Sequence, residues 1–149
     1  QDNAVTLAKM AGLARGKIIV GDSSGDPAAL AVGSANYVLT SDGTDISWGV
    51  AGTAWQAVVT GATTMVAGRG YFVNTTSSAF TMTLPASPSL GDTFRIIDYA
   101  GTFDSNTCTI GRNSEKIAGA SADMTVTTER AGLTLVFTDS TQGWLLAEK

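Results

Sequence analysis

Alternating apolar and polar positions dominate residues 53–149 and predict β-structure there. In the run 80–84 apolar side chains alternate with Thr81 and Thr83, and the run 133–138 repeats this alternation. Side chains two positions apart share one face of a strand, so each run has one apolar and one polar face. The pattern and its spacing are typical of an antiparallel β-sandwich or jelly roll. It predicts strands near 53–60, 71–76, 79–84, 93–99, 107–111, 124–129, 133–138 and 143–148.

The first sixteen residues have helical rather than strand periodicity. Leu7, Met10 and Leu13 recur at a spacing of about three residues, which places them on one side of a helix. Asn3 is a suitable N-cap and Gly16 a suitable C-terminal stop. The spacing predicts a short N-terminal helix of about 12 residues, which is marginal by itself in water and needs partners.

Residues 17–52 contain only short apolar runs separated by turns rich in Asp and Gly. Strands are predicted at 17–20, 28–32, 37–40 and 46–48. Their few large apolar side chains cannot enclose a core, so association with other copies is the stable solution. We therefore predict an intertwined trimerisation stalk over 1–52 and a β-sandwich head over 53–149. The predicted trimer interface consists of Leu7, Met10, Leu13, Ile18, Val20, Val38, Leu39 and Trp48.

Composition and charge exclude several classes of function. The 149 residues include 13 acidic and 9 basic side chains, and the net charge of −4 argues against a nucleic-acid partner. The chain has no His, which excludes Ser-His-Asp catalysis and His-based metal sites. Cys108 is the single Cys, so no internal disulfide forms. No apolar run reaches the roughly 18 residues of a membrane span, so no membrane insertion is expected. Because the chain begins with Gln1, we expect it to be part of a longer protein.

Acidic residues offer two kinds of candidate chemistry. The segments 22–26 and 42–45 carry closely spaced oxygen ligands but lack the Glu that an EF-hand requires, so we interpret them as turns. Two head carboxylates at glycosidase spacing would support hydrolysis of a polysaccharide. We prefer the interpretation that these are solvated turn residues, and we predict no catalysis, no cofactor and no metal. The candidate carboxylates are Asp92, Asp98, Asp104, Glu115 and Asp123.

Several motifs built from turn and core residues resemble those of bacteriophage tail fibres. In the first region they lie at 5–12, 16–22, 27–30, 37–45 (YVLTSDGTD) and Trp48. In the second region the segments that resemble the small β-sandwich near the end of such fibres are 83–86, 90–92, 98–103 (DYAGTF), 110–113, 116–117 and 143–144. The resemblance implies a homotrimer in the virion, with an interwoven stalk and a distal head that touches the host surface or another virion protein.

One loop of the head has the composition of a sugar-binding site. Tyr99 and Phe103 flank the Gly-containing segment 100–102, and Asp104 and Asn106 follow. Aromatic rings stack against sugar rings while Asp and Asn side chains bind their hydroxyl groups. Arg112 and Asn113 would join this site if the strand at 107–111 returned from the loop. The alternative is a well-packed corner between two strands.

The sequence therefore predicts a trimeric tail-fibre segment that attaches a virion to a host-surface glycan or protein without catalysis. Affinity would come from three copies acting together, so each site can be weak. A trimeric capsid decoration protein is one alternative, because it is also a small β-structured trimer. A tailspike-type depolymerase that binds host polysaccharide is the other, and it would release reducing ends from host envelope material.

Overall fold

The computed structural model describes residues 12–148, and all regular elements within them are β-strands, which confirms the all-β prediction. The chain divides into two compact units, Gln1–Ala51 and Gly52–Lys149, which are described separately below. Most of the predicted N-terminal helix, with Leu7 and Met10, lies outside the described residues. Within them, residues 12–14 are not helical and Leu13 is exposed.

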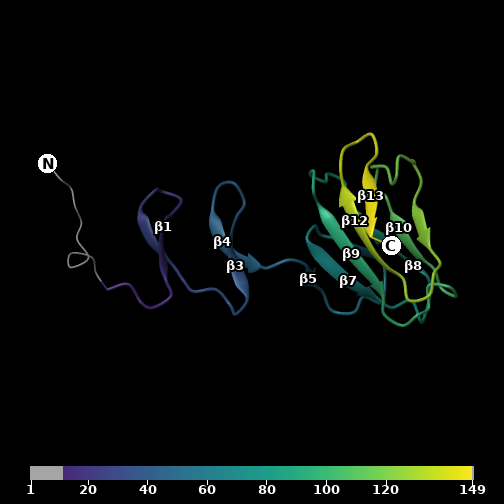
Figure 1. The fold of residues 1–149 in the computed structure, drawn as a ribbon, viewed down its shortest axis with the longest axis horizontal. Helices are drawn as coiled ribbons and strands as arrows, with labels where there is room; N and C mark the ends of the chain where they lie inside the picture. The colour runs from purple at the N-terminus through teal and green to yellow at the C-terminus, as the bar shows by residue number, and fades with distance from the viewer. Residues whose placement is uncertain (1–11, 149) are drawn as a thin grey trace. The chain divides into compact units, whose positions relative to one another are not determined.

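Residues 12–51 of the first unit form two antiparallel hairpins (Figure 1). They are β1 (Ile18–Gly21) with β2 (Pro27–Leu30), and β3 (Tyr37–Ser41) with β4 (Ile46–Val50). The same device forms both turns. Asp22 Oδ1 accepts hydrogen bonds from two backbone N–H groups of its turn at 2.8 and 3.0 Å. Asp42 Oδ1 does so at 2.9 and 2.8 Å. Both acidic segments are therefore Asx-type turns, as predicted.

Residues 52–148 of the second unit form nine strands in two sheets. The five-stranded sheet has the order β13 (Trp144–Glu148), β12 (Gly132–Phe137), β9 (Thr93–Asp98), β7 (Arg69–Val73), β5 (Ala54–Trp55). The four-stranded sheet has the order β11 (Met124–Val126), β10 (Cys108–Gly111), β8 (Phe80–Thr83), β6 (Thr63–Thr64). Figure 1 shows β7, β9, β12 and β13 side by side.

The chain alternates between the two sheets from β5 to β10. Strands that are neighbours in one sheet are therefore parallel: β5 with β7, β7 with β9, β6 with β8, and β8 with β10. Only the last three strands pair antiparallel, β11 with β10 and β12 with β9 and β13. The prediction of antiparallel sheets is wrong for the pairs formed among β5 to β10. Alternation of side chains reports which face is buried, and both strand directions produce it.

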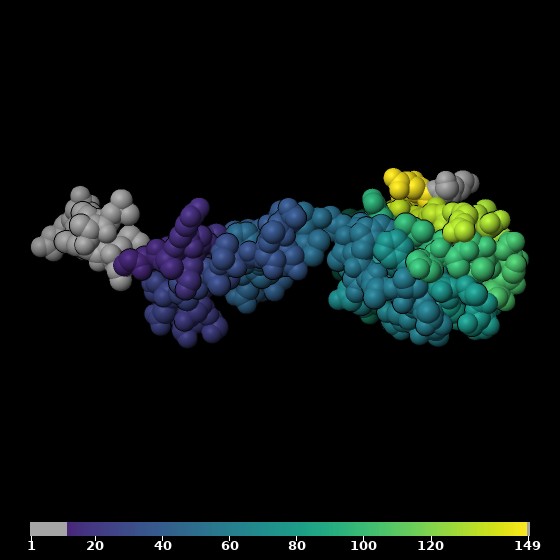
Figure 2. All heavy atoms as spheres, turned by 90° about the horizontal axis from the view of Figure 1, so that it is seen from below, coloured from purple at the N-terminus to yellow at the C-terminus, as the bar shows by residue number. Residues whose placement is uncertain are grey.

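Side chains from both sheets share one hydrophobic core. Val73, Phe94 and Leu135 come from the five-stranded sheet, and Met82 and Ile110 come from the four-stranded sheet. The largest core side chain is that of Trp144, whose ring centroid lies 5.0 Å from Phe94 and 5.2 Å from Phe137. Figure 2 shows the atoms of the second unit as one closely filled body. Burial at this density rigidly positions the loops that connect the sheets.

Candidate functional site

The loop after β9 is organised by a single buried carboxylate. Asp98 is only 2% exposed, and its Oδ1 accepts hydrogen bonds from the N–H groups of Gly101 at 2.9 Å and Thr102 at 3.2 Å. Its Oδ2 accepts from the N–H groups of Phe103 at 3.2 Å and Arg130 at 3.0 Å. Four donors therefore occupy both oxygens, and the carboxylate joins the 99–106 loop to the 127–131 loop.

The bonding of Asp98 sets its ionisation. Burial raises the pKa of this carboxyl, but the four backbone hydrogen bonds to the charged form outweigh burial, so the pKa of Asp98 lies below its ordinary value. The charge remains at neutral pH in spite of the buried position. Asp98, one of the candidate catalytic acids, is therefore a structural carboxylate with no free oxygen for a substrate.

Arg130 fixes the other side of the same loop. Its backbone adopts a positive φ of 57°, and its Nη1 donates a hydrogen bond to the Tyr99 carbonyl oxygen at 3.2 Å. The guanidinium passes directly over Gly101, where an added Cβ would lie 2.6 Å from Arg130 Nε. The φ of +71° at Gly101 favours glycine, and an added Cβ would displace the Arg130 guanidinium from its place over the loop. Arg130 and Gly101 were not predicted as site residues, because only the fold brings their two loops together.

The predicted site residues of the 99–106 loop differ in exposure to solvent. Tyr99 is 53% exposed, and Asp104 is also exposed. Asn106 is half-buried and its Nδ2 donates to the Thr76 carbonyl oxygen at 3.3 Å. Phe103 is fully buried in the hydrophobic core, so the prediction that it contacts a receptor is wrong. Its backbone N–H donates a hydrogen bond to Asp98 Oδ2, so the side chain and the backbone of Phe103 are both held.

Arg112 and Asn113 do not extend this loop site. Both residues follow β10, whereas the 99–106 loop precedes it, so the length of the strand separates them. Arg112 Nη1 donates to the carbonyl oxygens of Ser114 at 2.9 Å and Glu115 at 3.3 Å. Asn113 Nδ2 donates to the Leu84 carbonyl oxygen at 2.9 Å. The prediction that they join the loop is wrong, because β10 runs away from the loop and both side chains bind their own surroundings.

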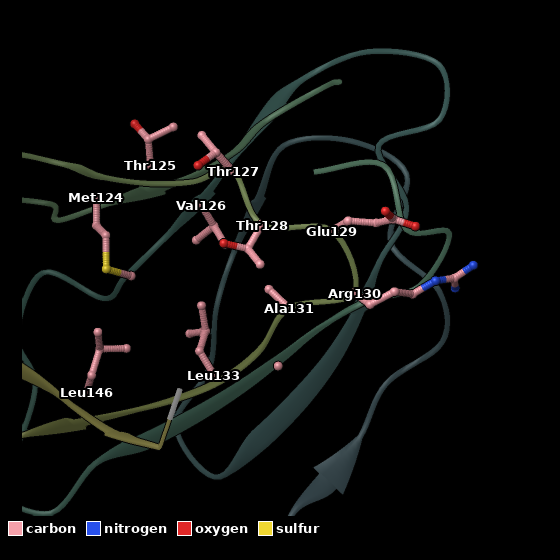
Figure 3. Close-up of a pocket in the computed structure, with 11 residues that line it drawn as sticks. Met124, Thr125, Val126, Thr127, Thr128, Glu129, Arg130, Ala131, Leu133 and Leu146 are labelled. Atoms are coloured by element: carbon pink, nitrogen blue, oxygen red, sulfur yellow. The ribbon is translucent and has the colours of Figure 1, made fainter. Parts of the chain in front are cut away.

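A groove that was not predicted lies beside the 127–131 loop. It has a volume of about 400 Å³, and Met124, Val126, Leu133 and Leu146 point into it (Figure 3). Glu129 and Arg130 line its outer end. We call it the edge groove, since β11 and β13 are the last strands of their sheets. Its apolar residues come from three strands, so no local pattern in the sequence could indicate it.

Most of the predicted association residues that lie within residues 12–51 are exposed there. Ile18, Val38 and Leu39 are exposed, and Leu39 has an exposed fraction of 45%. Val20 and Trp48 are half-buried. The Trp48 indole lies against Gly33, and its Nε1 donates to the Ala31 carbonyl oxygen at 2.6 Å. The hairpins therefore present apolar side chains that no other part of residues 12–51 covers.

Residues 12–148 contain no helix that could cross a membrane. The same residues contain no group of three or more metal-ligating side chains that could hold an ion. No known protein family matches the chain, and no curated protein is significantly similar to it.

Proposed function

We propose that this chain is a segment of a homotrimeric bacteriophage tail fibre that attaches the virion to a host surface without catalysis. The observation that carries the proposal is the uncovered apolar surface of the two hairpins. In this proposal residues 1–52 form an intertwined stalk, and the two sheets of 53–149 are the layers of a β-sandwich head. The proposed stalk contacts are Leu7, Met10, Leu13, Ile18, Val20, Val38, Leu39 and Trp48.

Energetics support association of the hairpins. An isolated two-stranded hairpin is at best marginally stable in water. Fully burying a Val, Leu or Ile side chain contributes about 1.5–3 kcal/mol. Ile18, Val38 and Leu39 are exposed in the single chain. Each of the three is already more than half covered, so burying the rest against two other copies would contribute roughly 1 kcal/mol per side chain, which favours association.

The head offers a surface suited to weak attachment. Tyr99 is an exposed aromatic residue whose backbone carbonyl accepts a hydrogen bond from Arg130, and Asp104 supplies an exposed carboxylate in the same loop. An exposed aromatic residue and a free carboxylate in one rigidly held loop suit a host glycan. Both oxygens of Asp98 are engaged by backbone N–H groups, which favours binding over hydrolysis. Three such sites on one trimer would bind a host surface much more tightly than one.

Binding to bacterial cells tests the proposal. The labelled chain is titrated onto a panel of strains, and envelope polysaccharide extracted from a bound strain is used as competitor. We expect saturable binding that Tyr99→Ala weakens more than tenfold while the oligomeric mass stays the same. Leu90→Ala is the matched control, because Leu90 is an exposed apolar residue of a different loop. Saturable binding to capsid shells instead of cells would indicate a decoration protein, and release of reducing ends would indicate a depolymerase.

A further inference from the structure

The two sheets of the second unit have outer faces of opposite character. On the four-stranded sheet, residues that alternate with the buried Met82 and Ile110 face outward. Pairing aligns Thr81, Thr109 and Thr125 in one row across β8, β10 and β11. Thr83 and Thr64 form the next row. This outer face consists mainly of threonines, whose hydroxyl groups suit contact with water.

The outer face of the five-stranded sheet is apolar. Trp55 is 42% exposed and stacks on Phe72 with ring centroids 4.7 Å apart. Phe72 pairs with Ile97 on β9, and Val136 on β12 pairs with Leu145 on β13. Along their strands, these residues alternate with buried core residues. All four, Phe72, Ile97, Val136 and Leu145, are half-buried. We call Trp55, Phe72, Ile97, Val136 and Leu145 the apolar sheet face. Within residues 52–148 no element covers it, because both sheets are single layers around one core.

A hollow with charged walls interrupts the apolar sheet face. It has a volume of about 270 Å³ and is lined by Trp55, Ile97, Gly132 and a polar row on the neighbouring strands. The polar row is Arg95, Thr134 and Glu148, which pair in register across β9, β12 and β13. Thr134 Oγ1 donates to Glu148 Oε2 at 3.2 Å. Nothing lies within 4 Å of a Cβ placed on Gly132, so this residue leaves room for a side chain from outside.

We propose that the apolar sheet face packs against a second copy of the head. This inference rests on the proposed trimer, because the stalk would hold the copies at high effective concentration. Charge supports a second copy as the occupant. The hollow in this face is lined by one cation and one anion, Arg95 on β9 and Glu148 on β13, so around a threefold axis the cation of one copy can lie against the anion of the next without excess charge. The hollow at Gly132 can receive an apolar side chain of the neighbouring copy. The threonine face then remains in contact with solvent.

Thiol labelling of the full chain tests this surface. Ile97→Cys places a thiol on the apolar sheet face, and Thr81→Cys places one at an equally half-buried position on the threonine face. Cys108 is fully buried, so it contributes little background. In the folded oligomer we expect maleimide to label the Ile97→Cys thiol at least tenfold more slowly than the Thr81→Cys thiol. The mass of each labelled sample is measured by light scattering.

The outcomes separate the two proposals. A mass of three chains with equal labelling rates would overturn the head contact and leave the trimer in place, with the face open to another partner such as a glycan. A mass of one chain for both variants and for the unchanged chain would overturn both. If Ile97→Cys alone dissociates the trimer, the face is a contact between copies.

A second variant, Gly132→Val, should have opposite effects depending on whether the apolar sheet face is free or covered by another copy. Gly132→Val adds a β-branched side chain to a strand at a position with open space and no positive φ, so it should stabilise a head whose outer face is free. If a neighbouring copy fills the hollow, the added side chain displaces it. We expect the concentration at which the trimer dissociates to rise at least tenfold. An unchanged dissociation concentration with a higher thermal midpoint would contradict the contact.

Discussion

Replacing Asp98 with Asn tests how the candidate loop is held. The carboxylate accepts two N–H donors on each oxygen, from Gly101 and Thr102 on Oδ1 and from Phe103 and Arg130 on Oδ2. An amide keeps one acceptor oxygen and places an NH₂ group in the position of the other. Two of the four backbone donors then lose their acceptor and face another donor. The substitution therefore combines lost charge-assisted bonds with unpaired donors in a site that is only 2% exposed.

The expected loss in the free energy of unfolding follows from the number of hydrogen bonds that the substitution removes. Hydrogen bonds to charged groups contribute about 1.5–3 kcal/mol each, and a buried donor left without an acceptor costs about 1–3 kcal/mol. After partial relaxation of the loop, Asp98→Asn should lower the free energy of unfolding by about 3–4 kcal/mol. At about 4–8 °C per kcal/mol for a unit of this size, the thermal midpoint should fall by at least about 12 °C.

Urea and thermal unfolding followed by tryptophan fluorescence measure this cost, because Trp144 lies in the core of the same unit. Asp104→Asn is the control. It makes the same chemical change in the same loop, but Asp104 is exposed and its carboxylate accepts only from Ser105 Oγ, at 3.1 Å. The control should stay within about 0.5 kcal/mol of the unchanged chain. Equal stability of the two variants would refute the assignment of Asp98 as the organising group.

The pH dependence of stability gives an independent reading of Asp98. Burial raises its pKa, and the four backbone N–H groups outweigh burial, so the folded-state pKa is below the unfolded-state value of about 3.9. Such a carboxyl stabilises the folded state above the unfolded-state pKa, and this stability is lost as the pH falls through the folded-state pKa. Unfolding measured from pH 6 to pH 2 should therefore show a shallower acid loss for Asp98→Asn. Parallel curves would contradict this account.

Further predictions concern other parts of the chain. Leu39→Lys should convert a trimer to monomers in light scattering, since a buried charge would replace an apolar contact. Phe103→Ala should lower the free energy of unfolding by about 3–5 kcal/mol, whereas Tyr99→Ala should change it by less than about 1 kcal/mol in urea titrations. Burial and the charge of Asp98 raise the pKa of the Cys108 thiol to about 12, so its labelling at pH 8 should follow unfolding.

The positions of most strands could be predicted from the sequence because alternation is a local property. The runs 79–84, 107–111 and 133–138 each contain or nearly match an observed strand. The pairing of those strands could not be predicted. Parallel neighbours arise here because the chain visits the opposite sheet between them, and a single strand carries no signal of that path. The predicted strand at 53–60 is reduced to β5 and an isolated bridge at Val59, because few of its residues pair with β7.

The candidate site was predictable only in part, for a similar reason. An aromatic residue in a Gly-containing loop suggests exposure, and this holds for Tyr99. Phe103 has the same sequence context, but its side chain is buried in the core while its N–H donates to Asp98. Arg130 belongs to a segment far along the chain from this loop. It is held at the loop because its N–H donates to Asp98 and its Nη1 donates to the Tyr99 carbonyl oxygen. These contacts depend on tertiary structure, which the alternation of side chains does not encode.

The absolute mass of the chain in solution tests the central claim most directly. Multi-angle light scattering at micromolar concentration distinguishes one chain of 15.2 kDa from a closed assembly of three. We predict a mass of three chains that persists on dilution, because the exposed hairpin residues would be buried between copies. A compact monomer at the same concentration would contradict the trimeric stalk, and with it the proposal of a fibre.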